Sequence, residues 1–196
     1  MIRFVSSALT AWLVREKAIL SEDTQLYAYA AYCLIWGLLP VIISLLFGVL
    51  FGLVIESLFL ILPFILLRKF SGGFHLKSPA LCLVCSATLL SGALLAIEEL
   101  LTIPNPTLLT LYVLLAVLSL WFHSPVSSVE KRLSCKEIRA FRTIARCIAL
   151  FCLTGYLLMA FTQQFTIAIP LGVGIILTAL LQIPNILSGK QTTNVS

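Results

Sequence analysis

A polar stretch interrupts the apolar sequence at residues 68–82, which read RKFSGGFHLKSPALC. It holds three cations, two adjacent glycines, one histidine and one cysteine, and it lies between two long apolar runs. Long apolar runs cross a bilayer, whereas cationic residues stay at its surface. We therefore expect the remainder of the chain to form a membrane scaffold that holds this stretch in place.

Composition defines the class of protein. Of 196 residues, 60% are hydrophobic and 11% are charged, whereas soluble domains have about 45–50% apolar and roughly 25% charged residues. The sequence therefore predicts an all-α, multi-pass protein of the cell membrane, with residues 1–196 forming one domain surrounded by lipids. The net charge of +5 does not indicate a nucleic-acid partner, because the cations cluster at the ends of apolar runs.

Six apolar runs predict six transmembrane helices, since about 20 residues suffice for one crossing. We expect spans at about 26–47, 50–67, 80–97, 107–122, 144–162 and 165–183. Residues 1–20 have apolar positions at spacings of three and four, which favours an amphipathic helix in the membrane surface or a helix packed against the bundle. Glu56 lies inside the second run, where a carboxylate is a functional candidate unless it sits near the outer interface.

The basic residues predict the orientation of the chain. The breaks near 48–52, 98–106 and 163–164 carry no lysine or arginine. Because cytoplasmic loops are enriched in these residues, we expect both termini and residues 68–82 to face the cytoplasm. In chain order the cations are Arg3, Arg15, Lys17, Arg68, Lys69, Lys77, Lys131, Arg132, Lys136, Arg139, Arg142, Arg146 and Lys190.

Cys82 is the candidate nucleophile. The reducing cytoplasm favours a free thiol, and Ser78 followed by Pro79 is typical of a helix start. Cys82 then lies in or just after the first turn, where the helix dipole favours a thiolate. A nearby imidazole, that of His75, is the partner that nucleophilic catalysis on acyl groups requires.

Other interpretations of these residues stay open. Gly72 and Gly73 can present backbone N–H groups to an oxyanion or allow close substrate approach, or they form a simple turn. Cys82 and Cys85 form a C-x-x-C pair, which is compatible with a metal site completed by histidines or with a redox dithiol. We expect no metal and no cofactor, because Cys85 lies deeper among apolar residues and a structural zinc site needs four ligands.

The stretch from Arg68 to His75, followed by Cys82, resembles the active-site motif of the accessory gene regulator B (AgrB) family. These are membrane cysteine endopeptidases of Gram-positive quorum sensing. Residues 123–142 resemble the cytoplasmic segment of that family, and the size and span layout are also similar. The resemblance implies that Cys82 is the nucleophile and His75 its general base. It also implies that a homodimer is possible.

The resemblance implies a substrate as well. It is a small autoinducer propeptide with an amphipathic N-terminal helix and an acidic C-terminal tail. The enzyme removes the tail, holds the peptide as a thioester on Cys82, and releases it as a cyclic thiolactone or lactone. The alternative function is a non-enzymatic six-span transporter or peptide exporter, for which charged residues within several spans are expected.

The cations on the expected cytoplasmic side are candidates for binding the acidic tail, anionic lipid headgroups, or both. Lys77 is the strongest single candidate because it lies close to Cys82 in the sequence. The candidates are Arg68, Lys69, Lys77, Lys131, Arg132, Lys136, Arg139 and Arg142.

Overall fold

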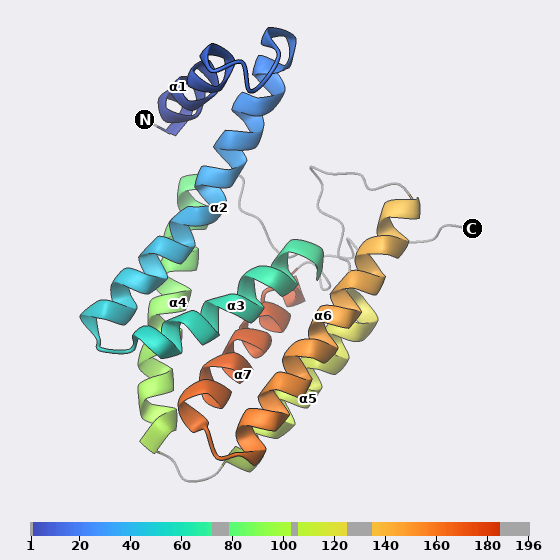
Figure 1. Ribbon diagram of the computed structural model, residues 1–196. Coiled ribbons are helices and arrows are strands. Elements are labelled where there is room, and N and C mark those ends of the chain that lie inside the picture. The colour runs from blue at the N-terminus through green and yellow to red at the C-terminus, as the bar shows by residue number, and fades with distance from the viewer. Residues whose placement is uncertain (1, 72–78, 103–105, 125–134, 185–196) are drawn as a thin grey trace.

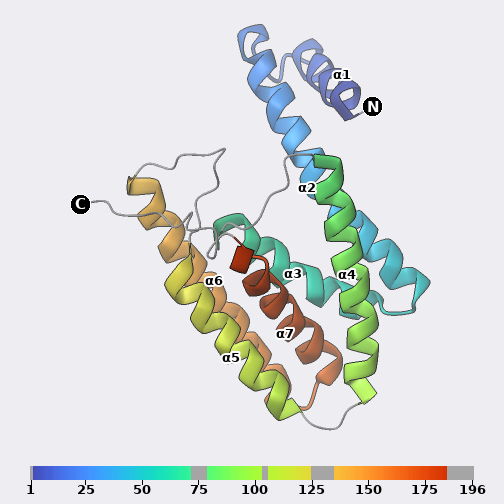
Figure 2. The same cartoon turned by 180° about the vertical axis from the view of Figure 1, so that it is seen from behind.

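The computed structural model describes residues 2–71, 79–102, 106–124 and 135–184, and these form seven α-helices with one short 3-10 helix (Figure 1). The described part contains no strand. Most of the helices run lengthwise along the molecule, and Figure 2 shows the same arrangement from behind. Their bounds are α1 Ile2–Arg15, η1 Ser21–Asp23, α2 Thr24–Leu50, α3 Val54–Ser71, α4 Pro79–Thr102, α5 Pro106–His123, α6 Cys135–Phe161 and α7 Phe165–Leu180.

The long apolar run between residues 24 and 71 is divided where the sequence predicts. α2 ends at Leu50, and Gly52 has a φ of +70°, in the left-handed region that glycine adopts without steric cost. The Leu53 N–H donates to the Gly48 carbonyl at 2.7 Å, which closes the turn. Glu56 consequently lies in the first turn of α3, where the helix dipole favours a carboxylate.

α7 lies in the middle of the bundle and packs against α3, α4, α5 and α6. Its glycines allow this close approach. A Cβ built on Gly174 would lie 2.5 Å from the Leu60 carbonyl oxygen, and one built on Gly172 would lie 2.9 Å from the Tyr156 ring. The buried Tyr156 hydroxyl shares a 2.8 Å hydrogen bond with Thr110, which joins α6 to α5.

Three of the described helices are long and apolar enough to cross a membrane, namely Thr24–Leu50, Leu81–Thr102 and Ile138–Phe161. α3, α5 and α7 are shorter, with 18, 18 and 16 residues. They correspond to the expected spans 50–67, 107–122 and 165–183, so a count of six crossings stays a prediction.

Three helices extend by four or more residues beyond the spans expected from the sequence. α3 continues through Arg68 and Lys69 to Ser71, so the polar stretch 68–82 begins as helix. α4 continues through Glu98 and Glu99 to Thr102. α6 begins at Cys135, inside the polar segment that we expected to connect spans four and five. Apolar positions at Ile138 and Phe141 continue the helical spacing of the later core residues, which explains the earlier start.

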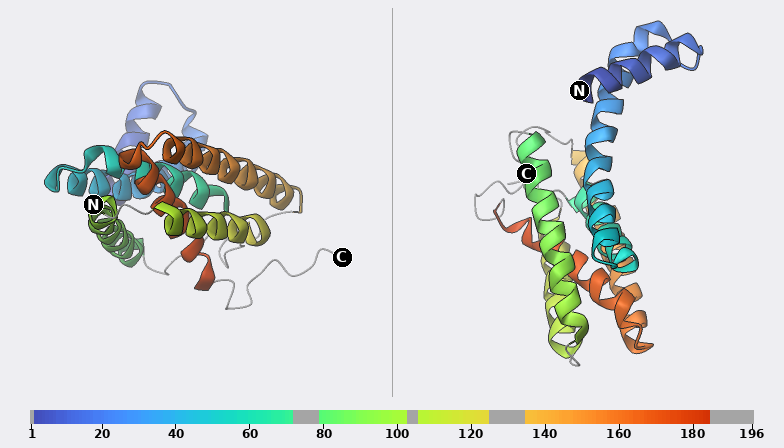
Figure 3. Two further views of the ribbon diagram at one scale, coloured as in Figure 1. Left: turned by 90° about the horizontal axis from the view of Figure 1, so that it is seen from below. Right: turned by 90° about the vertical axis from the view of Figure 1, so that its left-hand side faces the viewer.

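The N-terminal segment is a helix, as its spacing predicts, and it packs against α2. α1 lies across the N-terminal end of α2, away from α5, α6 and α7 (Figure 3). The side chains buried on α1 are Ser6 and Thr10, whereas Val5, Leu9 and Trp12 are exposed. An apolar face is thus left uncovered, and its location in a membrane surface stays a prediction.

Candidate functional site

One end of the bundle brings together the helix termini that surround Cys82. α3, α5 and α7 finish at this end, and α4 and α6 begin there (Figure 1). Segments far apart in the sequence are therefore close in space at this end. The turn between α6 and α7 lies at the opposite end (Figure 1).

Cys82 is the fourth residue of α4, which begins at Pro79 as the sequence predicts. Its side chain is half-buried, and its thiol is free. Cys85, one turn further along, is also a free thiol and is exposed. Cys82 thus occupies the first turn, where unpaired backbone N–H groups point toward the helix start.

Arg68 is the side chain that the structure places against Cys82. Its guanidinium lies near the Cys82 thiol and interacts with it electrostatically, and its charge also acts on Cys85. The same group lies over the Phe64 ring, 5.6 Å from the centroid. Burial lowers the pKa of the Arg68 guanidinium from its ordinary value, and the Cys82 sulfur partly offsets this effect. An arginine nevertheless remains cationic at any physiological pH.

The surroundings of Cys82 are suited to a cysteine that reacts as a nucleophile. A cysteine in a helix's first turn with an adjacent arginine is a setting in which proteins use thiolate nucleophiles. Guanidinium N–H groups near this sulfur are also suited to an oxygen on an acyl group bonded to it. The sequence marked Arg68 only as a substrate-binding candidate, so its pairing with Cys82 is a structural finding.

Gln182, just beyond α7, is a polar residue of this end that the sequence analysis missed. Its amide nitrogen Nε2 donates to the Ser71 carbonyl at 2.9 Å and to the Ser124 hydroxyl oxygen at 3.2 Å. All three residues are buried. The amide therefore joins the ends of α3, α5 and α7.

The described cations differ in exposure and in the contacts that they make within the protein. Arg139 and Arg142 on α6 and Lys69 on α3 are exposed. Arg146, in contrast, stacks 4.7 Å from the Trp121 ring centroid and donates to the Trp121 carbonyl at 3.2 Å. Arg146 thus binds the end of α5.

Several predicted site residues lie outside the described parts of the chain. One of them is Lys136, which lies within α6 but whose side chain is outside the described part. The others are His75, Gly72, Gly73, Lys77, Lys131 and Arg132.

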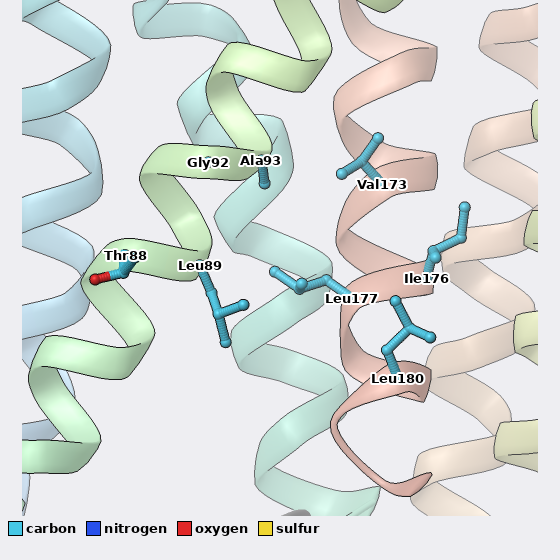
Figure 4. Close-up of a pocket in the computed structure, with 8 residues that line it drawn as sticks. All are labelled: Thr88, Leu89, Gly92, Ala93, Val173, Ile176, Leu177 and Leu180. Carbon is cyan, nitrogen blue, oxygen red and sulfur yellow. The ribbon is translucent and has the colours of Figure 1, made fainter.

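An apolar pocket of about 330 Å³ lies between α4 and α7 (Figure 4). Leu89 on α4 and Leu177 on α7 point toward each other across it. Leu89 follows Cys82 by seven residues, or about 10 Å and two helical turns, so both lie on one face of α4. The Thr88 hydroxyl at the edge bonds to the Val84 carbonyl of its own helix. The lining therefore offers apolar surface. It comprises Thr88, Leu89, Gly92, Ala93, Val173, Ile176, Leu177 and Leu180.

Comparison with known proteins gives a family match over most of the chain. The family described as accessory gene regulator B matches residues 6–185. Two AgrB-like proteins of Clostridium perfringens, from strain 13 / Type A and strain SM101 / Type A, are each 30% identical over 82 residues. Those residues span 42% of this chain and 38% of each relative. No solved structure matches the chain.

Proposed function

The chain belongs to the accessory gene regulator B family, and on this premise we propose that it is a membrane cysteine endopeptidase. The substrate is a small autoinducer propeptide that carries an acidic C-terminal tail. The enzyme removes this tail and keeps the remaining peptide as a thioester on Cys82. The observation that carries the proposal is the Arg68 guanidinium near the Cys82 thiol in the first turn of α4.

In the first step the Cys82 sulfur attacks the carbonyl carbon of the scissile peptide bond. A C–S bond forms, the C–N bond breaks, and the acidic tail leaves as an amine. His75 takes the thiol proton and returns it to the leaving nitrogen, which balances the reaction without a cofactor. The product of this step is the peptidyl thioester.

Arg68 has a specific task in this step. Negative charge develops on the carbonyl oxygen when the sulfur attacks, and a fixed N–H donor near that oxygen lowers the barrier. A guanidinium near the sulfur is also near the carbonyl of an acyl group that becomes bonded to that sulfur. The backbone N–H groups of Gly72 and Gly73 are further candidate donors in the same role.

In the second step a thiol of the peptide itself attacks the thioester. One C–S bond replaces another, so the exchange is nearly balanced in free energy and needs no ATP. The product is a cyclic thiolactone, or a lactone where the peptide supplies a hydroxyl. Hydrolysis is the competing reaction, and an active site with little water at the membrane boundary disfavours it.

The exposed cations near this end supply a binding surface for the acidic tail. Arg139 and Arg142 are exposed on α6, and Phe141 between them contacts Phe70, with ring centroids 6.0 Å apart. This contact ties the basic part of α6 to the C-terminal end of α3. Long-range attraction between this surface and a negative tail raises the rate of encounter.

Co-expression with the propeptide tests the proposal. Mass spectrometry follows the released tail for wild type, Cys82→Ala, His75→Ala and Cys85→Ala, with membrane protein levels measured in parallel. Loss of cleavage in Cys82→Ala and His75→Ala, together with normal cleavage in Cys85→Ala, supports the mechanism. Unchanged cleavage in Cys82→Ala overturns it, and equal loss in both cysteine variants indicates a dithiol or metal site instead.

A further inference from the structure

Gln182 connects three helix ends that are distant in the sequence. Its side chain is 0% exposed, as is that of Ser71, and Ser124 is 2% exposed. Ser71 is the last residue of α3, and Ser124 directly follows α5. The two hydrogen bonds of the amide span 111 and 58 positions of sequence. One side chain thus sets the relative position of α3, α5 and α7 at the end of the bundle that holds Cys82.

The bond to Ser71 lies close to the proposed chemistry. The last carbonyls of a helix have no donor within that helix, and the Gln182 Nε2 supplies one to the final residue of α3. Ser71 follows Arg68 by three residues, which is less than one helical turn. Movement of this helix end therefore moves the guanidinium that lies near Cys82.

The oxygen of the Gln182 amide indicates that this side chain does more than fill space in the core. The Gln182 oxygen Oε1 is buried and makes no hydrogen bond within the described structure. An unsatisfied buried acceptor lowers stability. Methionine or leucine fills a similar volume without that cost, so a glutamine here favours a role for its N–H group.

We propose that Gln182 is a positioning residue, whose amide holds the end of α3 so that Arg68 stays against Cys82. This inference rests on the proposed peptidase function. Gln182 acts through Ser71 and Arg68 and does not touch the peptide. Its loss consequently slows thioester formation and leaves peptide binding unchanged.

Purified protein in proteoliposomes, given synthetic propeptide, provides the test. Gln182→Met keeps the volume and removes the N–H donor, and we expect kcat to fall by roughly tenfold, the effect of one lost hydrogen bond, with KM within about twofold. The matched control is Thr178→Val. Thr178 lies one turn earlier on α7 and is equally buried, but its hydroxyl bonds only to the Gly174 carbonyl of its own helix. This control keeps the wild-type kcat.

A second variant separates positioning from packing. In Gln182→Glu the new carboxyl group can donate to the Ser71 carbonyl only while it is protonated. Burial raises the pKa of such a group above its ordinary value of about 4.3. The activity of this variant relative to wild type therefore falls as pH rises through that pKa. Arg68 stays cationic in both proteins, and wild type measured at each pH corrects for effects of pH that the two proteins share.

The outcomes are distinguishable. Absence of tail release by wild type overturns the proposed function and this inference with it. Release by wild type together with a normal kcat in Gln182→Met overturns the inference alone. A change in KM only, or a pH-independent activity ratio for Gln182→Glu, overturns it as well. Combining Gln182→Met with Arg68→Lys must give less than the summed effect if both act through one contact. A fully additive result contradicts the proposal.

Discussion

The placement of Arg68 near Cys82 is the structural feature on which the proposed stabilisation of the oxyanion depends. Arg68→Gln removes the charge while keeping N–H donors, and Arg68→Lys keeps the charge but loses the planar fork. If the guanidinium stabilises the developing oxyanion, we expect either change to slow tail removal by about 10²–10³-fold. Tail release per unit of membrane protein, measured by mass spectrometry, checks this value.

The control for Arg68 is Arg15→Gln. Arg15 is an exposed cation in the last turn of α1, a helix that packs against α2 rather than against the active-site end. This variant should process the peptide at the wild-type rate. If both arginine variants lose the same activity, overall charge is responsible and the local role of Arg68 is wrong.

The sequence predicts the position of Cys82 at a helix start well, because this signal is local. Ser78 and Pro79 mark a helix start, and α4 does begin at Pro79. The proximity of Arg68 to Cys82 is not predictable in this way, because it depends on how the end of α3 meets the start of α4. The contacts of Gln182 were missed for the same reason. From the sequence it is only a polar residue near the membrane-surface end of the expected span 165–183.

At the scale of helices, the contact between α3 and α7 depends on the absence of one side chain. A Cβ on Gly174 would lie 2.5 Å from the Leu60 carbonyl oxygen and 2.7 Å from Pro63 Cγ. Because backbone cannot yield as a flexible side chain can, Gly174→Ala should lower the free energy of unfolding by about 1–3 kcal/mol. Thermal unfolding in detergent measures the change.

Gly155 offers the matched control on α6. A Cβ there meets nothing within 4 Å, so Gly155→Ala gains helix propensity and should raise stability by roughly 0.5–1 kcal/mol. The two substitutions are chemically identical, and only the local packing differs. A Gly174→Ala protein as stable as the Gly155→Ala protein would contradict the close α3–α7 contact.

Helix existence followed from hydropathy, but helix ends did not. The polar composition of residues 123–143 concealed the first part of α6, whose charged residues include Arg139 and Arg142. In a soluble or interfacial helix such residues occupy one face while apolar residues such as Phe141 occupy the other. Hydropathy averages over both faces and therefore reports only the part of α6 that is apolar all round.

At the scale of the whole molecule, the lengths of the short helices have to be compared with the thickness of the bilayer. α7 has 16 residues, which is roughly 24 Å of helix against about 30 Å of hydrocarbon. Short helices are accommodated by local thinning of the bilayer at modest cost. The lysines and arginines fall in the terminal segments and in alternate connections between the helices. This distribution favours six crossings, with both termini in the cytoplasm.

Single cysteines in a background without the native ones distinguish six crossings from three. With six, cysteines at Phe51, Thr102 and Thr162 react with a membrane-impermeant maleimide in intact cells. Those at Asp23, Arg139 and Ile183 react only after permeabilisation. Three crossings, made by α2, α4 and α6 alone, are an odd number and place Asp23 and Ile183 on opposite sides. Labelling of Ile183→Cys in intact cells would therefore reject the six-span topology.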